Sequence, residues 1–161
     1  MIQIITTGGT IEGLEYEDSI NAPKESPLLL TTLLNQIKDV PGFTIQKAFL
    51  KDSRFIDKED RKFLAELVTS TESSKVLITH GTLTMVETAK YLGKLDIDKT
   101  IVLTGSFILG TLPNSDVLDN LKFAILNLTD LSKGVYIAMH HQIFNWYKVR
   151  KNIEQDRFED Y

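Results

Sequence analysis

Short apolar runs alternate with helical patterns along the chain, and this alternation constrains the fold more than any other feature. Four runs that end in small or turn-forming polar residues are typical of buried parallel strands: 2–5, 75–79, 100–104 and 134–139. A weaker fifth candidate is 43–50. Helix-start residues or helical spacing mark the segments 26–39, 57–70, 83–93 and 114–128. The order predicts an α/β fold, a three-layer sandwich of the Rossmann or flavodoxin-like kind with a mostly parallel sheet.

The bulk composition narrows the class of protein. A length of 161 residues fits one compact domain, and a net charge of −4 argues against a nucleic-acid partner. The absence of cysteine excludes disulfides and thiolate metal sites. The apolar runs fall far below the roughly 20 residues of a membrane span, and the opening MIQII has no basic signal-like flank. We therefore expect a cytoplasmic domain with no membrane partner.

Two segments lack a clear pattern of their own. The acidic stretch 12–26 is the one long irregular segment, which suits either a lid over a binding site or a solvated connection. The polar segment 145–161 is expected to form a helix packed at an edge of the domain. The aromatic residues in and beside it suit either a homodimer interface or packing of that helix. These are Phe144, Trp146, Tyr147, Phe158 and Tyr161.

Two similar strings follow the first and second of the four runs. TTGGTIEG (6–13) follows the opening run, and THGTLTM (79–85) overlaps the end of the next. Because ligands bind outside the carboxyl ends of parallel strands, both strings should face one cleft. Gly8 and Gly9 let the backbone approach a ligand and present bare N–H groups, as an oxyanion requires, and Thr10 offers a hydroxyl nucleophile. The same glycines also suit a tight turn without a functional role.

Five ordered motifs resemble the L-asparaginase/glutaminase family. They are TGGTI (7–11), KDS (51–53), THGTxTMxETA (79–89), TIVLTGS (100–106) and SD…NL (115–121). The resemblance identifies residues 1–161 as the family's N-terminal domain, without a counterpart of its C-terminal domain. It implies an amidohydrolase in which a threonine hydroxyl attacks a side-chain amide, forms an acyl-enzyme and releases ammonia. It implies no metal and no cofactor.

The resemblance also assigns roles to individual positions. Thr10 matches the family's nucleophile, and Thr82 matches a second threonine that assists catalysis or holds the substrate. The hydroxyl needs activation, because an alcohol at neutral pH is a poor nucleophile. Family members activate it with a Thr–Lys–Asp group and a tyrosine in a flexible loop. The positions matched to substrate contacts are Gly9, Ser53, Gly81, Leu83 and, in the irregular loop, Tyr16.

Two departures remove charge from the expected site. Leu83 stands where the family has an aspartate that binds the substrate's α-amino group, so a desolvated ammonium would lose its counter-ion. The family's catalytic lysine is also expected to be missing. In the equivalent region, 124–134, Leu131 is nearest to the position of that lysine, and Lys133 lies two residues further on. Lys133 either substitutes for it or binds carbonyl groups at a helix end.

The three histidines form the third departure. His140 and His141 follow the run at 134–139, and either suits a general base, since imidazole titrates near neutrality. As adjacent strand residues they should point to opposite faces, so at most one should face the cleft and a three-histidine zinc site is not expected. His80 is expected to be a hydrogen-bonded structural residue.

Three functions fit this pattern. The first is an asparaginase-like amidohydrolase with a Thr10 nucleophile and weak or lost activity on free asparagine. The second is a non-catalytic domain that binds a small amide or carboxylate in the same cleft. The third is a repurposed or engineered hydrolase that pairs a hydroxyl of Thr10, Thr82 or Ser106 with one of the paired histidines. A homodimer is expected in each case.

Overall fold

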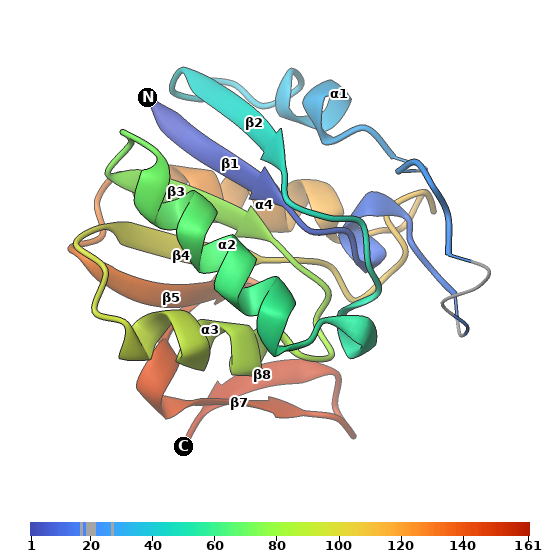
Figure 1. The fold of residues 1–161 in the computed structure, drawn as a ribbon. Coiled ribbons are helices and arrows are strands. Elements are labelled where there is room, and N and C mark those ends of the chain that lie inside the picture. Colours follow the sequence, from blue (N-terminus) through green and yellow to red (C-terminus); the bar gives the residue numbers. More distant parts are fainter. Residues whose placement is uncertain (17, 19–21, 27) are drawn as a thin grey trace.

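The computed structural model describes residues 1–16, 18, 22–26 and 28–161 as a three-layer α/β sandwich (Figure 1). Its six-stranded sheet has the order β2-β1-β3-β4-β5-β6. The first five strands are parallel neighbours, as in flavodoxin-like folds, and β6 pairs with β5 in the antiparallel direction. The strands are β1 (Ile2–Thr6), β2 (Phe43–Lys47), β3 (Lys75–Thr79), β4 (Thr100–Thr104), β5 (Gly134–Met139) and β6 (Gln142–Asn145).

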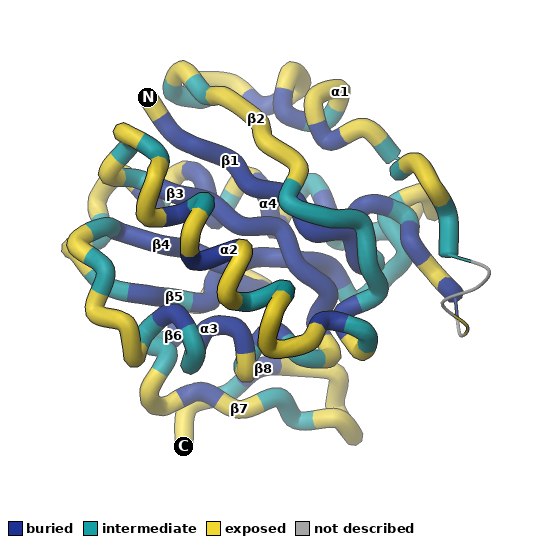
Figure 2. The backbone as a smooth tube through the Cα atoms, viewed as in Figure 1, coloured by how far each residue is buried: buried dark blue, intermediate teal, exposed yellow. Residues whose placement is uncertain are grey.

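Burial explains why the apolar runs form the central strands. Every residue of β1 and β4 is buried, as parallel strands covered on both faces require, whereas β2 at the edge is mostly exposed. Figure 2 shows this buried centre between more exposed layers. The four expected strands and the weaker fifth are therefore confirmed, and so is the fold class. The antiparallel edge strand β6 was not predicted.

Two helices cover each face of the sheet. On one face, α2 (Lys58–Ser70) and α3 (Met85–Lys94) pack into a core with Ile5, Ile78 and Leu103. On the other, α1 (Leu30–Leu34) and α4 (Val117–Leu128) pack into a second core. Figure 1 shows α2 and α3 side by side in front of the sheet, with α4 behind it. The helix predictions for 57–70, 83–93 and 114–128 are confirmed to within a few residues.

The predicted helix at 26–39 is much shorter in the structure. Only Leu30–Leu34 is α-helical, and the chain then leaves the helix through i→i+3 bonds from Gln36 to Leu33 and from Ile37 to Leu34. A five-residue helix has too few internal bonds to be stable alone, so burial of Leu30 and Leu34 holds it in place.

The predicted C-terminal helix at 145–161 is wrong. After a 3₁₀ turn at Trp146–Lys148, the chain forms an antiparallel hairpin of β7 (Val149–Asn152) and β8 (Arg157–Asp160). Val149 and Phe158 are buried in the α2–α3 core, which anchors one face of the hairpin. Short segments with one buried residue each carry too little periodicity to separate a strand from a helix.

The hairpin also decides where the aromatic side chains of this region lie. Phe144 and Phe158 are buried, and Trp146 packs against Gly93 of α3, where a Cβ would meet the indole ring at 2.2 Å. Only Tyr147 and Tyr161 of the five remain mostly exposed. The interpretation as internal packing is therefore correct for three of them.

The irregular loop is only partly covered by the structure. Residues 17 and 19–21 of the stretch 12–26 lie outside the described residues, so its expected role as a lid stays a prediction. Among the helices that are described, none is long and apolar enough to cross a membrane.

Candidate active site

The glycine loop after β1 and the loop after β3 meet at the carboxyl ends of their strands. Gly9 has a φ of 85°, and a Cβ there would lie 2.6 Å from the backbone nitrogen of Gly81. A Cβ on Gly81 would in turn lie 2.7 Å from Ser53 Cβ and Oγ. Glycine is needed at position 9 because a side chain there would meet the Gly81 backbone, and at position 81 because one there would meet the Ser53 side chain. The sequence expectation that both threonine strings face one cleft is confirmed.

A cleft of about 180 Å³ opens between these loops. The structure brings together six of the predicted site residues there and adds three that the sequence did not single out. Its lining consists of Gly9, Thr10, Asp52, Ser53, Arg54, Gly81, Thr82, Leu83 and Lys151.

Thr10 opens the 3₁₀ turn Thr10–Glu12 and is partly exposed to the cleft. Its carbonyl accepts hydrogen bonds from Gly13 and Gly110, which fix the backbone. Within the described part of the chain, no hydrogen bond occupies the Thr10 hydroxyl or the backbone N–H groups of Thr10 and Thr82. The hydroxyl and these N–H groups therefore have no partner among the described residues that a ligand would have to displace.

Ser53 supports the loop after β3. Its hydroxyl accepts a hydrogen bond from the Thr84 N–H at 3.2 Å, and its carbonyl accepts one from the Thr84 hydroxyl at 2.7 Å. The residue is 2% exposed. Ser53 therefore fixes the loop that carries Thr82 and leaves little of its own surface for a ligand.

A lysine that the sequence analysis did not consider lines the cleft. Lys151, on β7 of the hairpin, donates a hydrogen bond from Nζ to Thr82 Oγ1 at 3.1 Å. Burial lowers the pKa of the Lys151 amine, while the charges of Asp156 and Glu87 partly oppose that shift. An amine with a lowered pKa is neutral more often, so it can accept a proton.

The sequence search missed Lys151 because it looked for the lysine after α4. Lys133, found there, lies before β5 and forms ion pairs with Asp96 and Asp98 at 3.9 and 3.3 Å. No local signal identified Lys151, because the hairpin that carries it depends on the burial of Val149 and Phe158 against α2 and α3.

The charges around the cleft leave it short of carboxylates. Asp52 is the one acidic residue in its lining, and its carboxylate accepts hydrogen bonds from Arg54 Nη2 at 3.1 Å and from the Arg54 N–H at 3.0 Å. Leu83 is 50% exposed and gives the cleft an apolar wall. Among the described residues that line the cleft, Lys151 therefore has no unengaged acidic partner.

Tyr16 lies behind the cleft and does not line it. Its hydroxyl accepts a hydrogen bond from the Asp52 N–H at 2.9 Å, and its carbonyl accepts one from Arg54. Its ring stacks on Phe55 at 5.4 Å between centroids. In this position Tyr16 supports the segment 52–54 and does not contact the two threonines.

The paired histidines, considered above as candidates for a general base, lie away from the cleft in the structure. His140 and His141 are not strand residues but form the turn between β5 and β6, with φ of 48° and 61°. His140 Nε2 lies 2.7 Å from Asp116 Oδ2, and His141 packs against Phe123. Neither lines the cleft.

Asp116 anchors the neighbouring loop through the same contact. Burial opposes its ionisation, but hydrogen bonds from His140 and from the backbone of Ile108 and Phe107 outweigh it and lower the pKa of Asp116. Ser106 is 1% exposed and donates its hydroxyl to the Ile108 carbonyl, so it is no nucleophile for the cleft.

His80 is fully buried beneath the second loop, as its structural interpretation predicts. Its Nδ1 lies 2.7 Å from the Gly81 carbonyl, and its Nε2 lies 2.8 Å from Thr88 Oγ1. Arg61 Nε also donates to Thr88 Oγ1, at 3.0 Å. Because a carbonyl can only accept, Nδ1 carries the proton given to Gly81, and the Thr88 hydroxyl donates to the unprotonated Nε2 of the neutral ring. Burial lowers the pKa of His80 to about 4.

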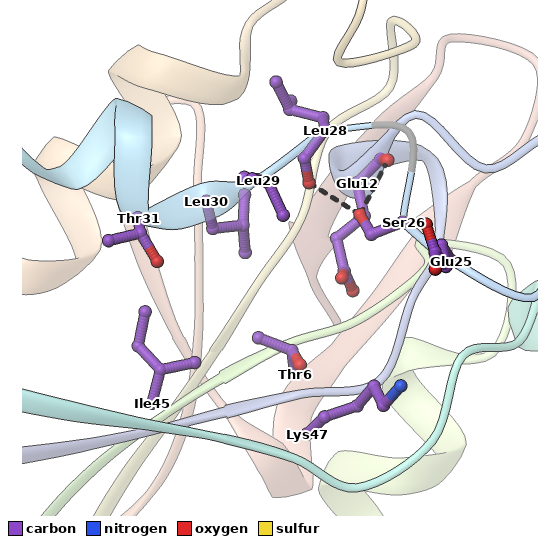
Figure 3. Close-up of a pocket in the computed structure, with 10 residues that line it drawn as sticks. All are labelled: Thr6, Glu12, Glu25, Ser26, Leu28, Leu29, Leu30, Thr31, Ile45 and Lys47. Carbon is purple, nitrogen blue, oxygen red and sulfur yellow. Dashed lines mark hydrogen bonds between the residues drawn. The ribbon is translucent and has the colours of Figure 1, made fainter.

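A second hollow, of about 320 Å³, lies beside the glycine loop (Figure 3). The Glu12 side chain extends into it toward Thr6 and Lys47. One Glu12 carboxylate oxygen accepts a hydrogen bond from the Gly8 N–H, which braces the loop before Thr10. Burial raises the pKa of the Glu12 carboxyl. Glu12 is thus a buried support of the loop and not a cleft residue.

The described residues contain no cluster of three or more histidines and carboxylates able to hold a metal ion. The groups that meet at the cleft are two hydroxyls, one amine and free backbone N–H groups. This set suits acyl transfer to a hydroxyl.

Comparison with known proteins agrees with this geometry. The model of the family described as asparaginase, N-terminal, matches residues 1–159. A glutaminase-asparaginase of Pseudomonas aeruginosa is 30% identical over 98% of this chain and 48% of the relative, and one of Acinetobacter glutaminasificans is 32% identical over 94% and 50%. The chain spans about half the length of these curated relatives.

Solved structures show the same half-length match. A probable cytoplasmic L-asparaginase from Campylobacter jejuni superposes with a TM-score of 0.81 at 30% identity, over 99% of this chain and 52% of that one. The thermostable L-asparaginase from Thermococcus kodakarensis superposes with a TM-score of 0.77 at 26% identity, over 99% and 50%.

Proposed function

Because this chain belongs to the asparaginase family, by its match to that family's N-terminal domain, we propose that its cleft hydrolyses an amide through Thr10. One observation carries the proposal: the Lys151 amine reaches Thr82 Oγ1 at 3.1 Å in a cleft that Thr10 also lines. Two hydroxyls and an amine of lowered pKa are the groups that a nucleophile and its base require.

The proposed reaction runs in two halves. Thr10 Oγ attacks the amide carbon, and its proton passes through the Thr82 hydroxyl to Lys151. The C–N bond then breaks, and the leaving nitrogen departs as ammonia with that proton. Water attacks the resulting ester, passes a proton back through the same groups and regenerates the Thr10 hydroxyl. The free N–H groups of Thr10 and Thr82 stabilise the oxyanion in each half.

The substrate is a small molecule with an amide and a carboxylate, and activity on free L-asparagine is weak or lost. The α-ammonium of asparagine would meet Leu83 and Lys151, with Asp52 already engaged by Arg54. An uncompensated ammonium in a desolvated site costs several kcal/mol. Weak turnover is therefore expected even if the nucleophile is intact.

A non-catalytic binding domain is the second candidate. The observation that favours it is the apolar Leu83 wall, which leaves Lys151 without a carboxylate partner in the cleft lining. A ligand held by N–H groups and Lys151 would need no proton transfer. The paired histidines lie outside the cleft, so the hydroxyl–histidine hydrolase is not carried further.

The test measures ammonia release from L-asparagine, L-glutamine and succinamate, together with the mass of protein quenched during turnover. We expect a covalent acyl adduct that maps to Thr10 and disappears in Thr10→Ala, with Thr32→Ala on the exposed surface as control. Ligand-induced thermal stabilisation without ammonia or adduct would favour the binding domain. A homodimer remains part of the proposal, and light scattering of the purified chain tests it.

A further inference from the structure

Four basic side chains line one open hollow between α2 and α3, remote from the two threonines. The hollow has a volume of about 440 Å³, within the range of small-molecule sites. Its cations are Lys58 and Arg61 from α2 and Lys90 and Lys94 from α3, and Glu87 is its one carboxylate. Tyr91 and Leu95 supply apolar surface. We call this set of seven residues the α2–α3 groove.

The charge of the groove opposes that of the chain. Four cations against one carboxylate give it a local charge of +3, whereas the whole chain carries −4. None of the four cations forms an ion pair with a carboxylate in the described part of the chain. The cations are also spaced i,i+3 on α2 and i,i+4 on α3, where like charges repel and destabilise a helix. Lys90 lies 6.0 Å over the Tyr161 ring, but neither this contact nor the bond from Arg61 to Thr88 neutralises a charge.

Arg61 differs from the three lysines because it is already oriented. Its Nε donates to Thr88 Oγ1 at 3.0 Å, which holds the planar guanidinium at the floor of the groove. No hydrogen bond within the described residues occupies its two Nη groups. A fixed guanidinium with free N–H groups matches the oxygens of a carboxylate or phosphate.

We propose that the α2–α3 groove binds a small organic anion, a carboxylate or phosphate joined to a ring or short alkyl chain. The anionic group lies between Arg61 and the lysines of α3, and the apolar part lies on Tyr91 and Leu95. This site does not depend on the proposed amide hydrolysis.

The same arginine connects the groove to the cleft. From Arg61 the hydrogen bonds run through Thr88 and His80 to the Gly81 carbonyl, next to Thr82. An anion that holds the Arg61 guanidinium therefore acts on the group that donates a hydrogen bond to Thr88 Oγ1, the partner of His80 Nε2. We therefore expect binding in the groove to shift the amide resonance of Gly81, a residue that lines the cleft and not the groove.

The test titrates ¹⁵N-labelled protein with phenyl phosphate and follows the amide resonances, with phenol and inorganic phosphate as partial probes. We expect phenyl phosphate to shift α2 and α3 resonances around the groove, and to bind at least tenfold more tightly than either partial probe. The proposal would be overturned if phenol bound as tightly as phenyl phosphate, or if the resonance shifts were confined to surfaces outside the groove.

Two charge-reversal double variants distinguish binding in the groove from a general effect of the protein's net charge. The double variant Lys90→Glu/Lys94→Glu should lower the affinity for phenyl phosphate at least tenfold. The control Lys38→Glu/Lys122→Glu, on the opposite layer, should change that affinity less than twofold. An equal loss of affinity in both double variants would overturn the proposed site. Thermal unfolding of each double variant checks that it is folded. Arg61→Lys keeps the charge but loses the bond to Thr88, so binding should persist while the Gly81 shift disappears. A Gly81 shift that survives in Arg61→Lys would overturn the connection to the cleft.

Discussion

Lys151 Nζ lies 3.1 Å from Thr82 Oγ1, so the C-terminal hairpin delivers an amine to a hydroxyl held by the loop after β3. The two residues are 69 positions apart in the chain. Neither has an acidic neighbour in the cleft except Asp52, which is engaged by Arg54. The chemistry of the cleft therefore depends on an amine whose pKa is lowered by burial.

Lys151→Gln should lower ammonia release from any amide the protein turns over by at least two powers of ten. The reason is that the Thr82 hydroxyl loses its base while the amide side chain can still donate a hydrogen bond. Lys148→Gln, in the adjoining 3₁₀ turn, is the matched control and should change the rate less than threefold. A similar loss in both variants would contradict a specific role for Lys151.

The same amine can be observed without a substrate. After ¹³C reductive methylation, two lysine resonances should titrate below the others, because burial lowers the pKa of both Lys151 and Lys99. Lys151→Gln should remove one of them. If both low-titrating resonances persist, the amine is not desolvated as the structure indicates.

Leu83→Asp should raise the turnover of L-asparagine at least tenfold over the parent chain. The new carboxylate supplies a counter-ion for a substrate ammonium in a cleft where the existing one is engaged. Leu126→Asp introduces the same charge at another exposed leucine, on α4 away from both the cleft and the groove, with an exposure of 43% against 50%, and should leave turnover unchanged. Strong asparagine turnover by the parent chain itself would show that another group binds the ammonium.

His80 should make the protein less stable as the pH falls from 6.5 to about 4. The unfolded imidazole binds a proton near pH 6.5, whereas the buried one does so only near pH 4, so the unfolded state holds more protons in this window. Full protonation of His80 should lower the free energy of unfolding by about 3 kcal/mol. Urea unfolding at several pH values should show this slope, and His80→Gln should remove it.

The parent chain must be compared with His80→Gln because Glu12 changes the stability in the opposite direction as the pH falls. Burial raises its pKa above 4.5, so the folded state holds more protons above that pH, and its contribution to stability falls as the pH rises. A slope that is unchanged in His80→Gln would assign the pH dependence to other groups.

Gly81→Ala should destabilise the fold by about 1–3 kcal/mol, because the added methyl meets Ser53 at 2.7 Å. Gly42→Ala is the matched control, since the nearest atom to its methyl is Met1 Cε at 3.9 Å, and it should stay within about 0.5 kcal/mol of the parent. Chemical denaturation measures both. Equal stability of the two variants would show that the two loops have room to separate.

Local patterns were sufficient for the five parallel strands of the sheet and for most of the helices. Fully apolar runs such as β4 are stable only when covered on both faces, and α2 carries its own start signal in the Asp57–Asp60 capping box. The hairpin of β7 and β8 could not be predicted, because Val149 and Phe158 become its anchors only once α3 presents a core for them.

The amino-acid sequence by itself determined the α/β architecture, the family and the meeting of the two threonine loops, because strand polarity places parallel carboxyl ends at one edge of the sheet. Only the tertiary structure decided which charges reach that edge. It placed Lys151 at Thr82, engaged Asp52 with Arg54 and turned His140 toward Asp116. These contacts join residues from different elements, and their pairing depends on side-chain packing that no local pattern records.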